Sequence, residues 1–156
     1  MALTVSLALI LSFIESRIPA FVSIPGVKVG LANIAVFFTL YKLGWPEAAI
    51  VSLIRVILVS LLFGNPVSLI YSISGAVLSL LTMVLLKSFT PLAEITVSIC
   101  GAIMHNVGQI LAASFMLETN VVIYYLPFLI LSGIVAGIAV GAVSGLLIKK
   151  VKIDLN

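Results

Sequence analysis

Long apolar segments follow one another along the chain, and short groups of polar, glycine and proline residues separate them. Most of these segments approach the roughly 20 residues that an α-helix needs to cross a bilayer. None shows the strict alternation of apolar and polar residues that is typical of a transmembrane β-strand. We therefore predict six spans, with approximate bounds Ala2–Ile18, Gly30–Leu43, Glu47–Phe63, Pro66–Leu86, Leu92–Leu117 and Val121–Ile148.

The composition supports a membrane protein built as one domain. The chain has 156 residues, of which 63% are hydrophobic and only 8% are charged. Soluble domains of this size carry about 25% charged residues. We expect residues 1–156 to form a single all-α membrane domain, a bundle of six transmembrane helices. The second span, Gly30–Leu43, is short and is expected to be tilted or partly buried in protein.

The distribution of basic residues predicts the orientation of the bundle. One side carries most of them, namely Lys42, Lys87, Lys149, Lys150 and Lys152. The other side carries only Arg17 and Lys28. By the positive-inside rule, we expect a multi-pass protein of the cell membrane with both termini in the cytoplasm. The basic residues lie at helix ends and form no patch, so no nucleic-acid partner is expected beside the lipid bilayer.

Polar residues inside the predicted spans indicate the functional site. Arg55, His105, Asn106 and Gln109 lie within apolar helices. An arginine at the centre of such a helix costs about 2.5–3.5 kcal/mol on insertion scales, so residues of this kind usually face a cavity, a partner or a ligand. His105 and Gln109 are four residues apart and share one helix face. Asn33 and Tyr71 lie in the outer halves of their predicted helices, which favours a site open to the outside.

Structural alternatives exist for each of these polar residues. Asn106 either borders the same cavity or hydrogen-bonds a neighbouring helix, since polar side chains often join membrane helices. Arg55 pairs with backbone carbonyls, binds an anionic ligand through its planar guanidinium, or extends into a water-filled crevice without binding anything. Glu47 and Glu94 both lie near the cytoplasmic side, so Arg55 has no obvious acidic partner within the membrane.

Two stripes of small residues predict close helix packing. Glycines repeat every four residues in the last span, at Gly133, Gly137, Gly141 and Gly145. Such spacing permits close backbone approach, and we interpret it as packing inside the bundle. The first span carries Thr4, Ala8 and Ser12 at the same spacing. This second stripe suits either packing or docking to a partner protein.

The residues that are missing favour a binding protein over an enzyme. Asp154 is the only aspartate, so the paired carboxylates of magnesium-diphosphate chemistry are missing. The sequence has no GxxxxGK[ST] phosphate-binding loop. His105 alone makes no metal site, and Cys100 is the only cysteine. We therefore expect no catalytic residues, no metal and no cofactor bound by the chain itself.

Several runs resemble those of a known family. The run PGVKVGLAN at residues 25–33 resembles the PGxKxGLAN signature of the Gx transporter family. The runs SLIRV at 52–56, SLLFG at 60–64, YSISG at 71–75 and HNVGQ at 105–109 also fit, as do YYLP at 124–127 and LSG at 131–133. The resemblance covers nearly the whole chain. Members are often labelled heptaprenyl diphosphate synthase component I, and they resemble the substrate-binding S components of energy-coupling-factor (ECF) transporters.

This resemblance implies a six-helix S-component fold and a set of ligand-binding residues. The family's polar positions correspond to Lys28, Asn33, Arg55, His105, Asn106 and Gln109, and we add Tyr71 to this expected substrate-binding set. Uptake would depend on a transmembrane T component and on ABC-type ATPases, which would use ATP. S components commonly dock through alanines on the first helix. The corresponding positions here are Thr4, Ala8 and Ser12, of which only one is alanine.

Two functions follow as expectations. In the first, the chain is the S component-like subunit of an ECF uptake transporter and captures a small vitamin-like or isoprenoid-related molecule from the outer face. In the alternative, it is a non-catalytic membrane subunit of a prenyl diphosphate synthase or of the quinone biosynthesis pathway. A self-sufficient channel or carrier is a weaker third hypothesis, because six short helices leave little room for a gated pathway.

Overall fold

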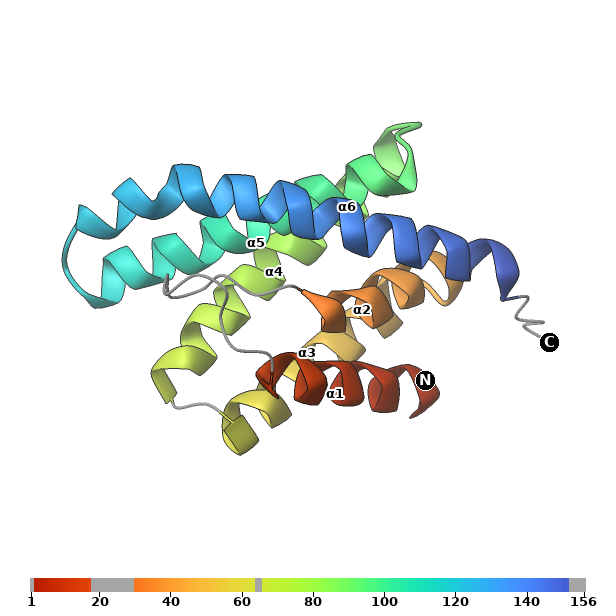
Figure 1. The fold of residues 1–156 in the computed structure, drawn as a ribbon, viewed down its shortest axis with the longest axis horizontal. Helices are drawn as coiled ribbons and strands as arrows, with labels where there is room; N and C mark the ends of the chain where they lie inside the picture. The colour runs from red at the N-terminus through yellow and green to blue at the C-terminus, as the bar shows by residue number, and fades with distance from the viewer. Residues whose placement is uncertain (1, 18–29, 64–65, 152–156) are drawn as a thin grey trace.

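The computed structural model describes residues 2–17, 30–63 and 66–151, and this part of the chain is helical without any β-strand (Figure 1). Its elements are α1 (Ala2–Arg17), α2 (Leu31–Lys42), α3 (Trp45–Phe63), α4 (Pro66–Phe89), α5 (Glu94–Met116), the 3-10 turn η1 (Val121–Tyr125) and α6 (Leu126–Lys150). The all-helical prediction is confirmed, and the observed helices lie within a few residues of the predicted spans.

The helices differ in whether they are long enough to cross a membrane. Among the described residues, four segments qualify by length and composition, namely α3, α4, α5 and η1 continued by α6. Helix α2 has 12 residues, which is about 18 Å at the α-helical rise and well short of the hydrocarbon core. The start of α1 and the end of α6 lie at the same end of the molecule (Figure 1).

Helix α2 is the central element of the fold. It contacts α1, α3 and α6, and most of its residues are buried, including Phe37 and Leu40. Other helices also bond to its backbone: Lys87 Nζ donates to Leu40 O at 2.6 Å, and Ser144 Oγ donates to Ile34 O at 3.4 Å. The prediction that this short helix is partly buried in protein is therefore confirmed.

Helix α5 lies between α4 and α6 at backbone contact distance. A Cβ atom added to Gly137 of α6 would lie 2.5 Å from Ile99 Cα, and one added to Gly108 of α5 would lie 2.6 Å from Ser74 O. Real Cβ atoms do not approach backbone atoms so closely, so only glycine fits at these positions. The predicted packing role of the α6 glycines is confirmed, because their face meets α5 along its length.

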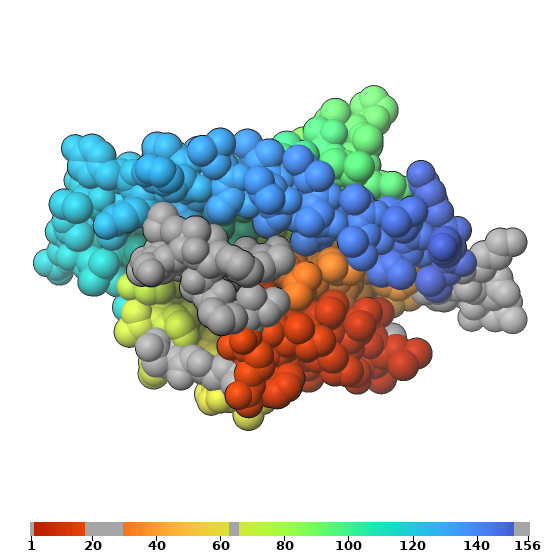
Figure 2. Space-filling view, in the orientation of Figure 1, coloured from red at the N-terminus to blue at the C-terminus, as the bar shows by residue number. Residues whose placement is uncertain are grey.

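The outer surface is apolar and the inner face of α1 is made of small residues. Thr4, Ala8 and Ser12 are buried, whereas Leu3 and Ile10 are 86% and 56% exposed. In Figure 2, α6 runs along the molecule and α1 lies below it on the same face. Large apolar side chains that point outward, with small ones inside, are typical of helices surrounded by lipid.

The glycine contacts generate a prediction about stability. Gly137→Ala should destabilise the protein by about 1–3 kcal/mol, because the new methyl group meets the backbone of α5. Gly145→Ala is the matched control, since its nearest contact is the flexible Glu94 carboxylate, with Oε2 at 3.1 Å. Thermal unfolding in detergent measures both variants. Equal melting temperatures for the two would show that α5 and α6 separate easily.

Candidate functional site

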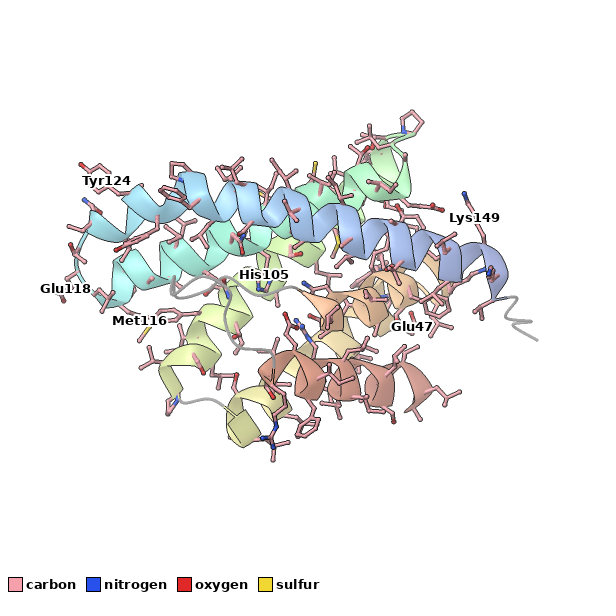
Figure 3. All side chains as sticks on the ribbon, in the orientation of Figure 1. Glu47, His105, Met116, Glu118, Tyr124 and Lys149 are labelled. Atoms are coloured by element: carbon pink, nitrogen blue, oxygen red, sulfur yellow. The ribbon has the colours of Figure 1, made fainter. Side chains whose placement is uncertain are left out.

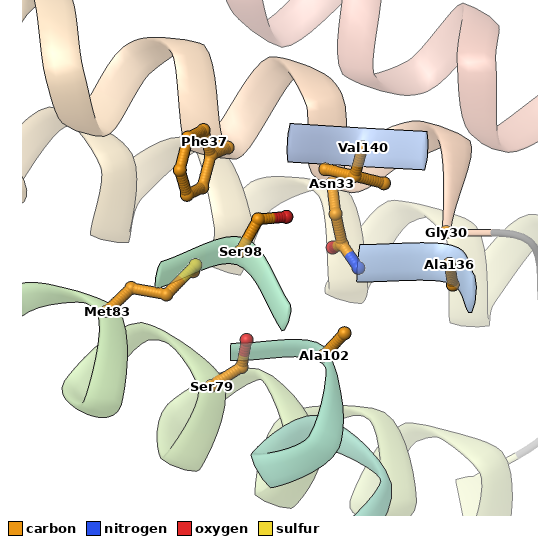
Figure 4. Close-up of a pocket in the computed structure, with 9 residues that line it drawn as sticks. All are labelled: Gly30, Asn33, Phe37, Ser79, Met83, Ser98, Ala102, Ala136 and Val140. Carbon is orange, nitrogen blue, oxygen red and sulfur yellow. The ribbon is translucent and has the colours of Figure 1, made fainter. Parts of the chain in front are cut away.

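A small cavity lies where α2, α4, α5 and α6 meet (Figure 4). Its volume is about 20 Å³, which is room for about one water molecule. Ligand pockets are commonly about 300–1,000 Å³, so a ligand would require these helices to move apart. The lining residues combine apolar groups with a few hydroxyls and one amide: Gly30, Asn33, Phe37, Ser79, Met83, Ser98, Ala102, Ala136 and Val140.

A polar seam between α4 and α5, formed by Ser79, His105 and Gln109, extends this cavity. On α4, Ser79 lines the cavity and Gly75 lies one turn earlier on the same face. A Cβ on Gly75 would lie 3.0 Å from both His105 Cε1 and Gln109 Cγ of α5. Glycine at this position therefore lets the two polar side chains rest directly on α4. Figure 3 shows His105 near the middle of the molecule, away from both ends.

Two buried polar atoms lack hydrogen-bond partners within the described ranges. They are the Arg55 Nε, a donor, and the Gln109 Oε1, an acceptor. An unsatisfied buried polar group costs about 1–3 kcal/mol, and more when it is charged. Native proteins carry few such groups, and those present often mark a site that is completed by a ligand, an ion or water.

Arg55 has an acidic neighbour that the sequence did not indicate. The Glu15 carboxylate of α1 interacts electrostatically with the Arg55 guanidinium. Glu15 Oε1 also accepts a hydrogen bond of 2.6 Å from Gly30 N, which lies at the start of α2. Gly30 has a φ of +78°, a left-handed conformation that glycine adopts readily. The sequence shows no obvious acidic partner for Arg55, and folding supplies Glu15 as an acidic neighbour because it places the end of α1 beside α3.

Asn106 faces away from this seam and joins α5 to α6. Its Nδ2 donates to Leu129 O at 2.6 Å, and the side chain is buried. A Cβ on Gly133 would lie 3.1 Å from the same nitrogen. Of the two interpretations of Asn106, the structure therefore supports a hydrogen bond to a neighbouring helix.

Of the remaining predicted site residues, only some lie at the cavity or the polar seam. Asn33 lines the cavity, and Tyr71 is half-buried one turn before Gly75 on α4. Lys28 lies outside the described residues. The α1 stripe of Thr4, Ala8 and Ser12 is turned inward, where α1 meets α2 and α3. Docking of a partner through that stripe stays a prediction, and it requires α1 to move.

Sequence reasoning missed the cavity residues Ser79, Ser98 and Met83 and the acidic residue Glu15. Serines are common in membrane helices and carry no distinct signal. Glu15 had one available signal: it lies three residues after Ser12, so it continues the face of the α1 stripe. In the part of the chain that is described, no three His, Cys, Asp or Glu residues are grouped in a way that would hold a metal ion.

A comparison with protein families gives one clear match. The family model described as heptaprenyl diphosphate synthase component I matches residues 4–147. No curated protein and no solved structure matches the chain. The matched range includes Glu15, Arg55, the polar seam and the whole lining of the cavity.

The contact of Asn106 predicts a structural role that is separable from binding. Asn106→Leu should lower stability by about 0.6 kcal/mol, and at most about 1.7, because a hydrogen bond between membrane helices is lost. Gln109→Leu is the matched control. It removes an acceptor without a partner, so stability should stay equal or rise. Melting temperatures in detergent test the pair, and a greater loss for Gln109→Leu would contradict the assignment.

Proposed function

Because the chain belongs to the heptaprenyl diphosphate synthase component I family, we propose that it is the non-catalytic membrane subunit of a prenyl diphosphate or quinone pathway enzyme. Its role in this proposal is to hold an anionic molecule with an apolar body inside the bilayer and to present it to a partner protein. The six helices would form a transmembrane bundle around that molecule, with α2 buried at its centre.

The observation that carries the proposal is the buried Arg55 Nε. A cation inside an apolar helix bundle is expensive, and it is usually kept for a functional purpose. The planar guanidinium suits the bidentate binding of a phosphate or carboxylate. Glu15 supplies part of the charge balance from α1, while the Nε of Arg55 remains available to a ligand.

Binding without bond cleavage fits the residues that are present. Magnesium-dependent diphosphate chemistry uses paired carboxylates, and the chain has a single aspartate, Asp154. The seam offers instead an imidazole, an amide and hydroxyls, which orient a ligand by hydrogen bonding. Catalysis would therefore belong to the partner enzyme.

A second candidate function, the S component of an ECF uptake transporter, is favoured by where the polar seam lies along α4 and α5. Gly75 lies in the half of α4 that begins at Pro66, and Gln109 lies in the half of α5 that ends at Met116, whereas Lys87 is near the opposite end of α4. If the lysine-rich ends face the cytoplasm, the site is nearer the outer face, as capture from outside requires. In this case a T component and ABC-type ATPases would be the partners, and the ATPases would use ATP.

Arg55→Gln is the direct test of the shared binding step. Loss of a hydrogen bond to a charged group costs about 1.5–3 kcal/mol, so affinity for geranyl diphosphate should fall about 10- to 100-fold. Arg17→Gln is the matched control, because Arg17 is exposed and lies over the Phe13 ring at 5.1 Å. Calorimetry on protein in lipid nanodiscs gives both affinities. Equal affinity of Arg55→Gln and wild type would refute the binding role of Arg55.

A pull-down from native membranes separates the two candidate functions. The tagged protein is solubilised in mild detergent, and the proteins that accompany it are identified by mass spectrometry. We expect a soluble prenyl diphosphate synthase, absent from an untagged control. Recovery of paired ATPases and a T component without a synthase would replace this proposal with the transporter function.

A further inference from the structure

Two unpaired atoms of opposite hydrogen-bonding character lie in the interior of the bundle. Arg55 Nε is a donor and needs an acceptor, whereas Gln109 Oε1 is an acceptor and needs a donor. They would satisfy one another if they met, but each lacks a partner among the described residues. Any ligand that satisfies both must therefore carry groups of both kinds.

A chain of contacts connects the two atoms through the cavity. Arg55 interacts electrostatically with Glu15, and Glu15 Oε1 accepts a hydrogen bond from the backbone N–H of Gly30. Gly30 lines the cavity together with Ser79 of α4. One turn earlier on α4, Gly75 packs against the Gln109 side chain. The cavity lining includes neither Arg55 nor Gln109, but it reaches Gly30, which bonds to Glu15, and Ser79, which lies one turn from Gly75 on α4.

We propose that the ligand of this protein carries an anionic group for Arg55 and, at a distance along an apolar body, an N–H or O–H donor for Gln109 Oε1. This inference rests on the proposed binding function and narrows its ligand class. A plain prenyl diphosphate has the anion and the apolar body but no donor on its hydrocarbon tail. A hydroxylated isoprenoid diphosphate satisfies both atoms.

The preference for a ligand with a donor group follows from the free-energy cost of leaving Gln109 Oε1 unpaired. A buried site that is built to hydrogen-bond a ligand group strongly rejects an analogue that lacks the group. A Cβ on Gly75 would lie 3.0 Å from Gln109 Cγ, so the base of the Gln109 side chain packs against α4. The difference in affinity between ligands with and without the donor should therefore depend on the amide of Gln109. It should be absent when the amide is removed.

The test compares two probes that differ by a single hydroxyl. Geranyl diphosphate and 8-hydroxygeranyl diphosphate share the diphosphate and the carbon chain, and only the second carries an O–H at the far end. Calorimetry with the full chain in lipid nanodiscs should show at least about tenfold tighter binding of the hydroxylated probe. In Gln109→Leu, which keeps the fold, the two probes should bind equally.

The outcomes distinguish the inference from the function on which it rests. Equal binding of both probes by the wild type would overturn the donor requirement and leave the anion site at Arg55 intact. A preference that survives in Gln109→Leu would also overturn it, because the donor would then meet another group. Binding of neither probe would overturn the proposed isoprenoid ligand class together with the inference. Melting temperatures confirm that Gln109→Leu is folded.

Discussion

The close backbone packing of α5 between α4 and α6 is the constraint on which the interior of this protein depends. Glycines on α4 and α6, and Gly108 on α5, bring helix backbones to distances that exclude any Cβ atom. In lipid no hydrophobic force joins the helices, so such contacts and a few hydrogen bonds must hold them. The packing also fixes the polar groups: Gly75 supports His105 and Gln109, and Gly133 leaves room for the bond of Asn106 to α6.

The interior leaves polar atoms of Arg55 and Gln109 without hydrogen-bond partners among the described residues, which lowers stability. Arg55 is costly in an apolar bundle, and the Glu15 carboxylate offsets only part of that cost because the Nε of Arg55 stays unpaired. The cavity beside these groups has room for about one water. Binding of a larger molecule in this cavity must therefore separate the helices that line it. The glycine contacts oppose separation of α4, α5 and α6, so movement of α1, α2 or α3 is the easier route.

The two candidate functions share one physical step. In either proposal, the chain would hold a small molecule within the bilayer and pass it to a partner. Membership of the heptaprenyl diphosphate synthase component I family supports the first, and the position of the polar seam along α4 and α5 favours the second. The partner protein decides between them, whereas the chemistry around Arg55 and Gln109 is common to both.

The sequence by itself determined the helices and the glycine packing. Span length, helix breakers and four-residue spacing are local properties, so the observed helices and the α6 glycine face were predictable. Periodicity also placed His105 and Gln109 on one helix face. It did not show which neighbour that face meets, because helix spacing gives directions relative to one axis only. Only the tertiary structure turned the α1 stripe inward, brought Glu15 to Arg55 and Gly30, and directed Asn106 to Leu129, since each depends on how separate helices are placed in space.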